Sequence, residues 1–571
     1  MSGPLDPNSA VPLIASRSSL LARLRAEEFD LLIVGGGITG SGVARDAALR
    51  GLRVALVEAD DFASGTSSRS SRLVHGGVRY LEHGYLHLVF EASRERRTLL
   101  RIAPHLVRPL PFTWPVYRGA RVPRWKLRAG LLLYDALALF RNVAPHRGLS
   151  ARDVVEQEPH LRRSDLRGGA RYYDAATDDV RLTLANALSA AESGAVVVNH
   201  TAVRALCRSD GGAAGSPVTG ARVQDALTGD QWTVRARVIV NAAGPWGDRV
   251  RALEQPGTPP LVRGTKGVHV AVPRERVGNR DALTLLSPVD GRVMFVLPAG
   301  AQAIIGTTDT PTAAAPDDVR ATEADVDYLL RSANAYFPEA RLTRADVVSA
   351  WAGIRPLVAS GYRDDGSVPA PASASREHLV ERGPGGVIAV SGGKLTTYRS
   401  MAAEVVDAVE RTLGRPRTPS RTAVLPLPGG DIRSLEAEIA EASAAAGDRE
   451  VGERLAAAHG SRWREVWGLA TAEPALGARL VPGLPYTGAE LAYAAERELA
   501  CTLADLLVRR TPLAFARADA GVGVAAAAAA LVAPRLGWDA ARQAGEVERY
   551  RREAARLFGV DAAEVPAGRE G

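Results

Sequence analysis

Three glycines near the start of the chain have the spacing that a bound pyrophosphate requires. Gly35-Gly36-Gly37-Ile38-Thr39-Gly40 matches G-x-G-x-x-G. Glycines in this pattern permit a tight turn, a close approach of backbone to phosphate and the packing of a helix on a strand. Glu58 follows about 18 residues later, where a carboxylate would bind a ribose hydroxyl. Gly35, Gly37, Gly40 and Glu58 therefore predict a dinucleotide site, which could take either a nicotinamide or a flavin.

Residues 64–82 have the composition of a surface for a long, flat cofactor. They read SGTSSRSSRLVHGGVRYLE, so small hydroxyl residues and glycines precede His75, Arg79 and Tyr80. Small residues let a cofactor lie against the chain, and hydroxyl groups and backbone amides can hold a diphosphate or the edge of an isoalloxazine ring. This segment favours a flavin.

The chain resembles the FAD-dependent glycerol-3-phosphate dehydrogenases of the aerobic, quinone-linked type. The resemblance runs in one order from about residue 30 to 515. It rests on SGTSSRSSRLVHGGVRYLE (64–82), NAAGPW (241–246), KGVHV (266–270), IIGTTDTP (304–311), WAGIRPLV (351–358), SREH (375–378), SGGKLTTYR (391–399) and ELACTLADLLVRRT (498–511).

The resemblance implies FAD as the cofactor and assigns residues to each part of it. The ADP portion is expected at Gly35, Gly37, Gly40 and Glu58, with help from Thr66, Ser67 and Ser68. Ala243 and Gly244 should lie beside the cofactor, and Gly392 and Gly393 should let backbone approach the flavin. Lys394 should lie by the flavin ring and stabilise negative charge on its reduced form.

The activity implied is the oxidation of sn-glycerol 3-phosphate to dihydroxyacetone phosphate, with hydride transfer to FAD and electrons passed on to a quinone. A phosphate monoester is matched best by guanidinium groups. By resemblance, Arg79, Tyr80 and Arg376 would contact the phosphate, and Arg355 would face the substrate hydroxyls.

Two histidines are candidates for the base that removes the hydroxyl proton. His75 and His269 both lie in matching segments, and imidazole titrates near neutral pH. The residues do not decide between them, and His75 could serve only to position the substrate. Arg355 is too basic to accept a proton, which leaves it an electrostatic role. His75, His269, Arg355 and Lys394 are therefore the predicted catalytic residues.

Hydrophobic runs predict the elements that would position these residues. FDLLIV (29–34), a helix over 39–50 and RVALV (53–57) form a β-α-β unit. Similar strands follow much later, at 195–198, 236–240 and 386–390. We therefore predict an α/β fold with a discontinuous Rossmann-like FAD-binding domain, a mixed or antiparallel β-sheet substrate cap and a helical C-terminal domain.

The predicted boundaries follow from composition. A flexible N-terminal arm (1–26) precedes an oxidoreductase region (27–420), whose FAD-binding parts are 27–110, 178–250 and 346–420 and whose substrate cap is 111–177 and 251–345. A proline- and glycine-rich linker (421–434) leads to the helical domain (435–565), which could mediate a homodimer.

Charge and hydropathy suggest a protein that touches a membrane without crossing it. The net charge is +7, and ten basic residues with one acid fall between Arg94 and Arg128, interleaved with Trp114, Tyr117 and Trp125. With the leucines that follow, this segment could lie on an anionic lipid surface, or it could be a buried helix of the cap. No apolar run is long enough to span a bilayer. We expect a cytoplasmic protein, peripheral on the inner face of the cell membrane.

Other functions fit the residues less well. An oxidase that passes electrons to oxygen would need no different residues, so that alternative stays open. A basic flavin-containing RNA-binding protein would need a nucleic-acid module that is not visible, and no nucleic-acid partner is expected. An amino-acid oxidase would need a carboxylate clamp rather than phosphate-binding groups. No metal-binding motif is present: the two cysteines, Cys207 and Cys501, make no pair.

Overall fold

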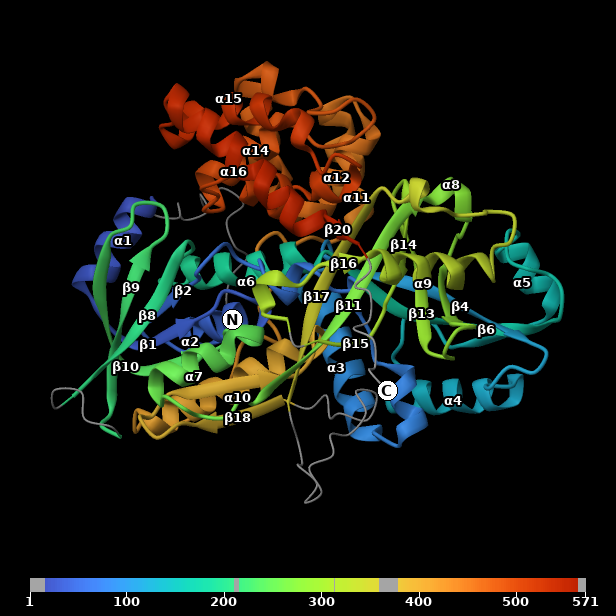
Figure 1. The fold of residues 1–571 in the computed structure, drawn as a ribbon, viewed down its shortest axis with the longest axis horizontal. Coiled ribbons are helices and arrows are strands. Elements are labelled where there is room, and N and C mark those ends of the chain that lie inside the picture. Colours follow the sequence, from blue (N-terminus) through green and yellow to red (C-terminus); the bar gives the residue numbers. More distant parts are fainter. Residues whose placement is uncertain (1–15, 210–214, 313, 359–377, 563–571) are drawn as a thin grey trace, which may run out of the picture.

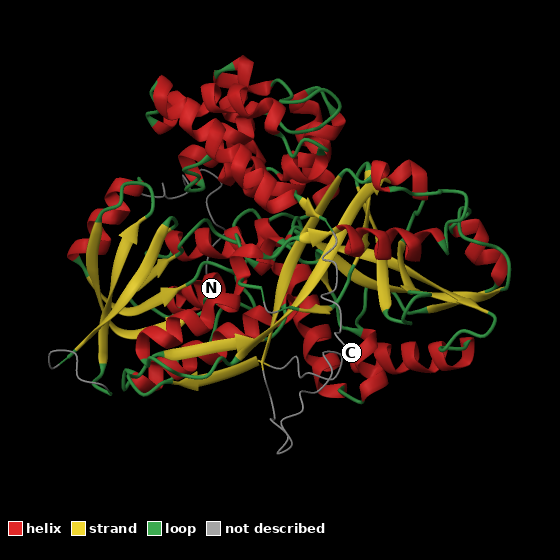
Figure 2. Cartoon of the chain, in the orientation of Figure 1, coloured by secondary structure: helices red, strands yellow, loops and turns green. Residues whose placement is uncertain are grey.

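The computed structural model describes residues 16–209, 215–312, 314–358 and 378–562. Two large β-sheets lie side by side, and a cluster of helices stands above the junction between them (Figure 2). This is the predicted fold class: an α/β chain with a nucleotide-binding sheet, a second mixed sheet and a helical C-terminal domain.

The first sheet contains the nucleotide-binding strands. Its centre is parallel, with β19, β10, β1, β2 and β7 in that spatial order, while β18, β9 and β8 extend it in antiparallel fashion. The bounds are β1 (Glu28–Val34), β2 (Val54–Val57), β7 (Val196–Val198), β8 (Thr201–Arg208), β9 (Val218–Asp225), β10 (Gln231–Asn241), β18 (His378–Arg382) and β19 (Ile388–Gly392).

Helices cover both faces of this sheet. On one face α2 (Ile38–Leu49), α6 (Asp179–Glu192) and α10 (Tyr398–Thr412) bury alanine, valine and leucine side chains. On the other face lie α1 (Arg17–Ala26), α7 (Gly247–Glu254) and the β8–β9 extension. Because both faces are covered, the central strands are apolar along their whole length; β1, for example, buries every residue after Glu28.

The second sheet is antiparallel apart from one parallel pair, β12 and β4. Its spatial order is β15-β11-β14-β13-β12-β4-β6-β3, with β17 paired to β11 and β5 to β6. The bounds are β3 (Leu73–Val74), β4 (Val107–Tyr117), β5 (Arg147–Leu149), β6 (Leu166–Thr177), β11 (Val262–Pro273), β12 (Ala282–Leu286), β13 (Val293–Ala299), β14 (Gln302–Gly306), β15 (Thr310–Pro311) and β17 (Ser349–Val358).

Strand β11 shows how this sheet separates a core from a functional face. Val268, Val270 and Val272 point into one core, which is closed by α9 (Glu323–Asn334) and the helices α5 (Ala151–Gln157) and α8 (Arg274–Val277). His269 and Ala271 alternate with these valines and point to the opposite face. That opposite face is covered by α3 (Leu86–Ile102), α4 (Arg124–Leu137) and part of the C-terminal domain.

The C-terminal domain is helical, as predicted, and lies at the top of Figure 1. It ends in a short strand, β20 (Val560–Asp561), which pairs with β16 (Ala321–Thr322). Its main helices are α11 (Leu435–Ala446), α12 (Arg449–His459), α13 (Trp463–Ala472), α14 (Gly488–Arg497), the π-helical segment η11 (Asp505–Arg510), α15 (Ala525–Leu536) and α16 (Ala540–Phe558).

Part of the expected N-terminal arm is an ordered helix. Residues 1–15 lie outside the described residues, but Arg17–Ala26 form α1. Ser16 caps its N-terminus by accepting a hydrogen bond from the N–H of Ser19. Leu20 and Leu24, one turn apart, are buried against the nucleotide-binding sheet. The burial of this i, i+4 pair is why the expectation of a flexible arm is wrong over these residues.

Two other segments differ from the expected organisation. Strand β17 falls within residues 346–420, the predicted third FAD-binding part, yet it pairs with β11 along its whole length and so belongs to the second sheet. Within the proline-rich linker, Leu427 is buried, and the Arg45 guanidinium donates to the Leu425 carbonyl at 2.7 Å. The linker is therefore packed along α2 rather than loose.

The basic segment is only partly a surface. Trp114 and Tyr117 are buried on β4, and Arg96 is buried in an ion pair with Asp174, so these three do not belong to an exposed patch. Trp125, by contrast, is 73% exposed. Within the described ranges, none of the helices has the length and apolar character that crossing a bilayer requires.

Candidate active site

The glycine motif forms a cradle between β1 and α2. Gly35 has φ +109°, and a Cβ there would come within 2.7 Å of the Ala242 carbonyl oxygen. At Gly40 a Cβ would collide with the carbonyl oxygen of Gly35. Gly37 is the N-cap of α2, and a Cβ there would fill the space beside the Ser67 hydroxyl. Only glycine fits at Gly35 and Gly40, and the cradle at this helix N-terminus suits the pyrophosphate of a dinucleotide.

Glu58 lies at the end of β2 beside this cradle. Its carboxylate accepts hydrogen bonds from the N–H groups of Gly36 at 2.6 Å and Asp60 at 2.9 Å. Burial nevertheless raises the pKa of Glu58 to about 7, because these two hydrogen bonds only partly offset the loss of water. An acceptor at this point fits an adenosine ribose, whose hydroxyls are donors.

The serine-rich segment connects the cradle to the second sheet. The Ser67 hydroxyl accepts from the N–H of Ile38 at the start of α2, at 3.0 Å. Thr66 donates to the Ile354 carbonyl on β17 at 2.7 Å, and Ser68 donates to the carbonyl of Gly65. The three predicted hydroxyl residues therefore lie where the two sheets meet, although Thr66 and Ser68 use their hydroxyls to fix the chain.

The remaining predicted cofactor residues follow the ends of two neighbouring parallel strands. Ala243 and Gly244 follow β10, Gly392 is the last residue of β19, and Gly393 follows it. Gly244, Gly392 and Gly393 all have positive φ, and a Cβ on Gly393 would collide with Met401. The carboxyl ends of parallel strands are where ligands bind in such sheets.

His269 is the most constrained of the predicted catalytic residues. It is 3% exposed, its ring stacks on Trp351 with centroids 5.5 Å apart, and its Nε2 lies 2.8 Å from the Ser71 hydroxyl. Nδ1 is buried without a hydrogen-bond partner among the described residues. Burial and the positive charges of Arg355 and Arg72 lower the pKa of His269 to about 3. The imidazole is therefore neutral at neutral pH.

Arg355 lies on the same face of the sheet as His269. It is four residues from Trp351 on β17, and Trp351 is the register partner of His269. Its guanidinium donates to Asp309 at 2.8 Å, and to the Thr307 hydroxyl and the Thr308 carbonyl at 3.1 and 3.0 Å. It lies over Gly267, where a Cβ would come within 2.6 Å of Nη2. A larger residue at position 267 would therefore have to displace the Arg355 guanidinium.

His75 and Lys394 belong to two segments that contact each other. The Thr396 hydroxyl accepts from the N–H of His75 at 3.2 Å and so joins the two predicted segments. The Lys394 Nζ lies 3.9 Å from the centroid of the Tyr80 ring, which places a cation over an aromatic face.

A chain of contacts brings the two predicted bases together. The His75 ring lies 6.4 Å from the ring of Phe295 on β13. Phe295 is the register partner of Gly306 on β14, and Gly306 is the partner of His269 on β11. Register partners point to the same face, so both histidines border one region of the second sheet.

Two predicted residues are not placed fully. Arg376 lies outside the described residues, and for Arg79 only the backbone, in η2 (Val78–His83), is described. Sequence reasoning in turn missed Ser71, Trp351 and Asp309, which hold His269 and Arg355. Each lies within a matching segment, but nothing in the sequence pairs it with its partner.

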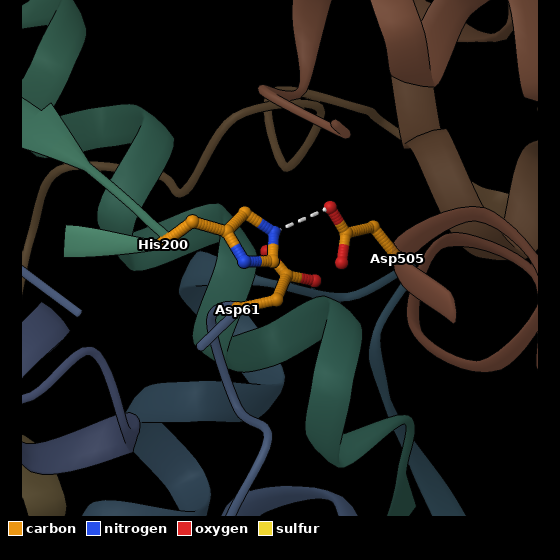
Figure 3. Close-up of side chains that lie close together, drawn as sticks. All are labelled: Asp61, His200 and Asp505. Atoms are coloured by element: carbon orange, nitrogen blue, oxygen red, sulfur yellow. Dashed lines mark hydrogen bonds and ion pairs between the residues drawn. The ribbon is translucent and has the colours of Figure 1, made fainter. Parts of the chain in front are cut away.

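A buried group of acidic and histidine side chains lies at the base of the C-terminal domain. Asp61, His200 and Asp505 each offer a ligand atom within 4.8 Å of the others (Figure 3). The Asp61 carboxylate, however, already accepts from Arg509 at 2.7 Å and Arg510 at 2.6 Å. A metal ion would have to displace two guanidinium groups, so the group is an ion-pair network.

Comparison with known proteins shows what the chain is similar to. Residues 30–399 match the family described as FAD dependent oxidoreductase, and residues 420–543 match the C-terminal domain of alpha-glycerophosphate oxidase. The glycerol-3-phosphate dehydrogenase 2 of Mycobacterium tuberculosis is 42% identical over 543 residues, which cover 94% of this chain and 90% of that protein. The mitochondrial glycerol-3-phosphate dehydrogenase of Homo sapiens is 38% identical over 94% of this chain and 74% of that protein.

A solved structure extends the similarity to three dimensions. The glycerol-3-phosphate dehydrogenase from Bacillus halodurans, complexed with FAD, has a TM-score of 0.77 and 31% identity, covering 95% of this chain and 98% of that one. These matches confirm the resemblance seen in the sequence. The chain therefore belongs to the glycerol-3-phosphate dehydrogenase family of FAD-dependent oxidoreductases.

Proposed function

We propose that this protein oxidises the C2 alcohol of sn-glycerol 3-phosphate to dihydroxyacetone phosphate. The alcohol carbon gives up a hydride and its hydroxyl gives up a proton, and FAD supplies the hydride acceptor when bound. The observation that carries the proposal is the neutral, buried His269 beside the cationic Arg355, on a sheet face that the serine-rich segment joins to the dinucleotide cradle.

His269 is the better candidate for the proton acceptor. It is neutral because of burial and two nearby arginine charges, and its Nε2 is already in hydrogen-bond contact with a hydroxyl, that of Ser71. A phosphate dianion entering the site would offset the positive charges and raise the pKa of His269, so the base would gain strength as the substrate binds. His75, whose backbone is held by Thr396, then positions the substrate.

The cationic groups each serve a different part of the substrate or cofactor. Arg355 is held by Asp309 and stabilises negative charge as it develops on the C2 oxygen. Tyr80, with Arg79 and Arg376, serves the phosphate, and Lys394, above the Tyr80 ring, stabilises negative charge on the reduced cofactor.

We propose a membrane quinone as the electron acceptor, with oxygen as the alternative. Support comes from an apolar surface around α3 and α4. Nine of the thirteen exposed large hydrophobic side chains among the described residues fall in this stretch: Tyr85, Leu86, Phe90, Trp125, Leu132, Leu133, Leu139, Phe140 and Val143. Arg121, Arg124, Lys126 and Arg128 are exposed beside them. We call these nine hydrophobic and four basic residues the α3–α4 surface.

The α3–α4 surface has the composition of an interfacial membrane contact. Apolar side chains enter the boundary of the bilayer, and basic side chains meet anionic headgroups. Helices α3 and α4 lie at the lower edge of the molecule in Figure 1, away from the C-terminal domain. Contact with the inner face of the cell membrane would bring the flavin side of the protein to a lipid-dissolved quinone.

Anaerobic titration tests the reaction directly. Purified yellow protein should lose its visible flavin absorbance when glycerol 3-phosphate is added, because the substrate alone reduces the cofactor. Glycerol and glycine serve as controls, and neither should bleach the protein. Bleaching by glycine, or none by glycerol 3-phosphate, would contradict the proposal. Reoxidation of the bleached protein by a quinone analogue faster than by oxygen supports the quinone, and the reverse order supports the oxidase.

A further inference from the structure

The loop that follows β2 carries the acid expected to bind the adenosine ribose. Residues 58–61, here called the ribose loop, begin at Glu58. One Glu58 oxygen accepts from the N–H of Asp60 at 2.9 Å, so the direction of this carboxylate depends on where the loop backbone lies. The loop backbone also accepts from His200 and Thr201, each at 2.6 Å, through the carbonyls of Asp60 and Glu58.

The C-terminal domain forms hydrogen bonds with Asp61, the last residue of the ribose loop. Asp61 is fully buried, and each of its carboxylate oxygens accepts from an arginine of η11. Arg509 donates to Oδ2 at 2.7 Å, and Arg510 donates to Oδ2 at 2.6 Å and Oδ1 at 3.0 Å. Both arginines are buried, so these pairs are shielded from salt and water.

The two arginines are themselves fixed by their own domain. Arg509 also donates to Asp505 at 2.8 Å, and Arg510 donates to the Glu498 carbonyl at 2.9 Å. Asp505 in turn accepts from His200 Nε2 at 2.9 Å, as Figure 3 shows. The ribose loop therefore meets a preformed pair of cations whose positions are set about 450 residues further along the chain.

We propose that Arg509 and Arg510 are positioning residues for FAD: the C-terminal domain fixes the ribose loop and thereby holds the adenosine half of the cofactor. This inference rests on the proposed role of Glu58. The two guanidinium groups do not touch the cofactor site; they act through Asp61 and the loop backbone on the direction of the Glu58 carboxylate.

The chain offers a matched control for this pair. Arg462, also in the C-terminal domain, forms a bidentate ion pair with Glu192 of α6 at 2.6 and 3.0 Å. It joins the same two parts of the protein but does not contact the ribose loop. Arg462→Gln therefore removes an interdomain ion pair but keeps the ion pairs of Arg509 and Arg510 with Asp61.

The experiment measures nucleotide affinity of the apoprotein, not turnover. The flavin is removed, and the full-length chain is titrated with FAD and, separately, with ADP, which carries the adenosine half alone. Arg510→Gln should weaken the affinities for FAD and for ADP by roughly tenfold or more. The reason is that the ribose loop must then be held for nucleotide binding without a charge-assisted hydrogen bond. Arg462→Gln should bind both as the wild type does. Equal losses in the two variants, or a loss for FAD without one for ADP, would overturn the inference.

A second variant guards against a folding defect in Arg510→Gln. Asp61→Asn keeps the shape of the side chain but removes its charge and replaces one acceptor oxygen with a donor, so it should also weaken ADP binding. Wild-type ADP affinity in Asp61→Asn, with circular dichroism unchanged, would refute the role of the pair. If the wild-type apoprotein itself binds neither FAD nor ADP, the proposed cofactor site is wrong, which is a separate result.

Discussion

Among single residues, the site depends most on how far the protein shifts the pKa of one imidazole, that of His269. A histidine in water is half protonated near pH 6.5. His269 is held neutral by burial and by Arg355 and Arg72, while Trp351 and Ser71 fix the plane of its ring. A base that is both neutral and fixed in direction needs no rearrangement before it accepts a proton.

His269→Gln tests this assignment. The variant should lower kcat by about a hundredfold to ten-thousandfold, the usual contribution of a positioned general base, with a smaller change in KM. Steady-state kinetics on protein with its full flavin absorbance measures this. Ser71→Ala, which removes only the partner of Nε2, should cost less than His269→Gln. If His269→Gln keeps most of its kcat and His75→Gln loses it, the base is His75.

At the scale of elements, local patterns predicted the nucleotide-binding unit well. The expected strand at 29–34, helix at 39–50 and strand at 53–57 correspond to β1, α2 and β2 within two residues at each end. Their signals are local: a buried parallel strand is apolar throughout, and a glycine turn must separate it from the helix.

Long-range pairing explains what the sequence could not predict. The match over 351–358 was visible, but nothing within it says that β17 pairs with β11 rather than joining the nucleotide-binding sheet. For the same reason Ser71 could not be paired with His269, which is 198 residues away. The arginines around Trp114 and Tyr117 in the sequence suggest surface aromatics, but β4 is buried continuously from Phe112 to Tyr117.

The junction of α3, α6 and α12 yields a prediction about pH. His105, just after α3, is 2% exposed. Burial, with the charges of Arg181 and His459, lowers its pKa to about 3. Below about pH 6.5 the unfolded chain binds a proton at this position and the folded chain does not, so stability is lost as pH falls, by about 1.4 kcal/mol per pH unit.

His105→Gln cannot take up that proton. Its deficit in unfolding free energy relative to the wild type should therefore shrink by about 2 kcal/mol between pH 8 and pH 5. Urea denaturation at the two pH values measures this difference. A deficit that stays constant for His105→Gln would show that His105 is protonated in the folded protein.

Across the folded protein as a whole, two basic surfaces differ in composition. The C-terminal domain carries exposed arginines along α16, whereas the α3–α4 surface on the other side combines arginines with exposed apolar side chains. A charged face alone is solvated; charge beside a contiguous apolar area is what an anionic bilayer binds.

Reversing the charge of arginines on each surface tests which of the two binds lipid. Arg121, Arg124 and Arg128 changed together to Glu should weaken co-sedimentation with anionic vesicles by more than about a hundredfold at low salt, since each basic residue near the surface contributes about 1 kcal/mol. Changing Arg551 and Arg552 of α16 to Glu, which alters the charge in the same direction, should leave vesicle binding unchanged. Full vesicle binding by the first variant would exclude the α3–α4 surface as the contact.

The interleaving of the two sheets also constrains how the protein can be made. Strand β1 pairs with β10, about 200 residues later, and β10 pairs with β19, about 150 residues later still. At a synthesis rate of about 5–20 residues per second, an emerging β1 waits on the order of ten seconds or more for β10, its neighbour on one side. During that interval an apolar strand edge is open to other nascent chains. Production of this enzyme should therefore depend on chaperones at the ribosome, and slower translation should increase aggregation.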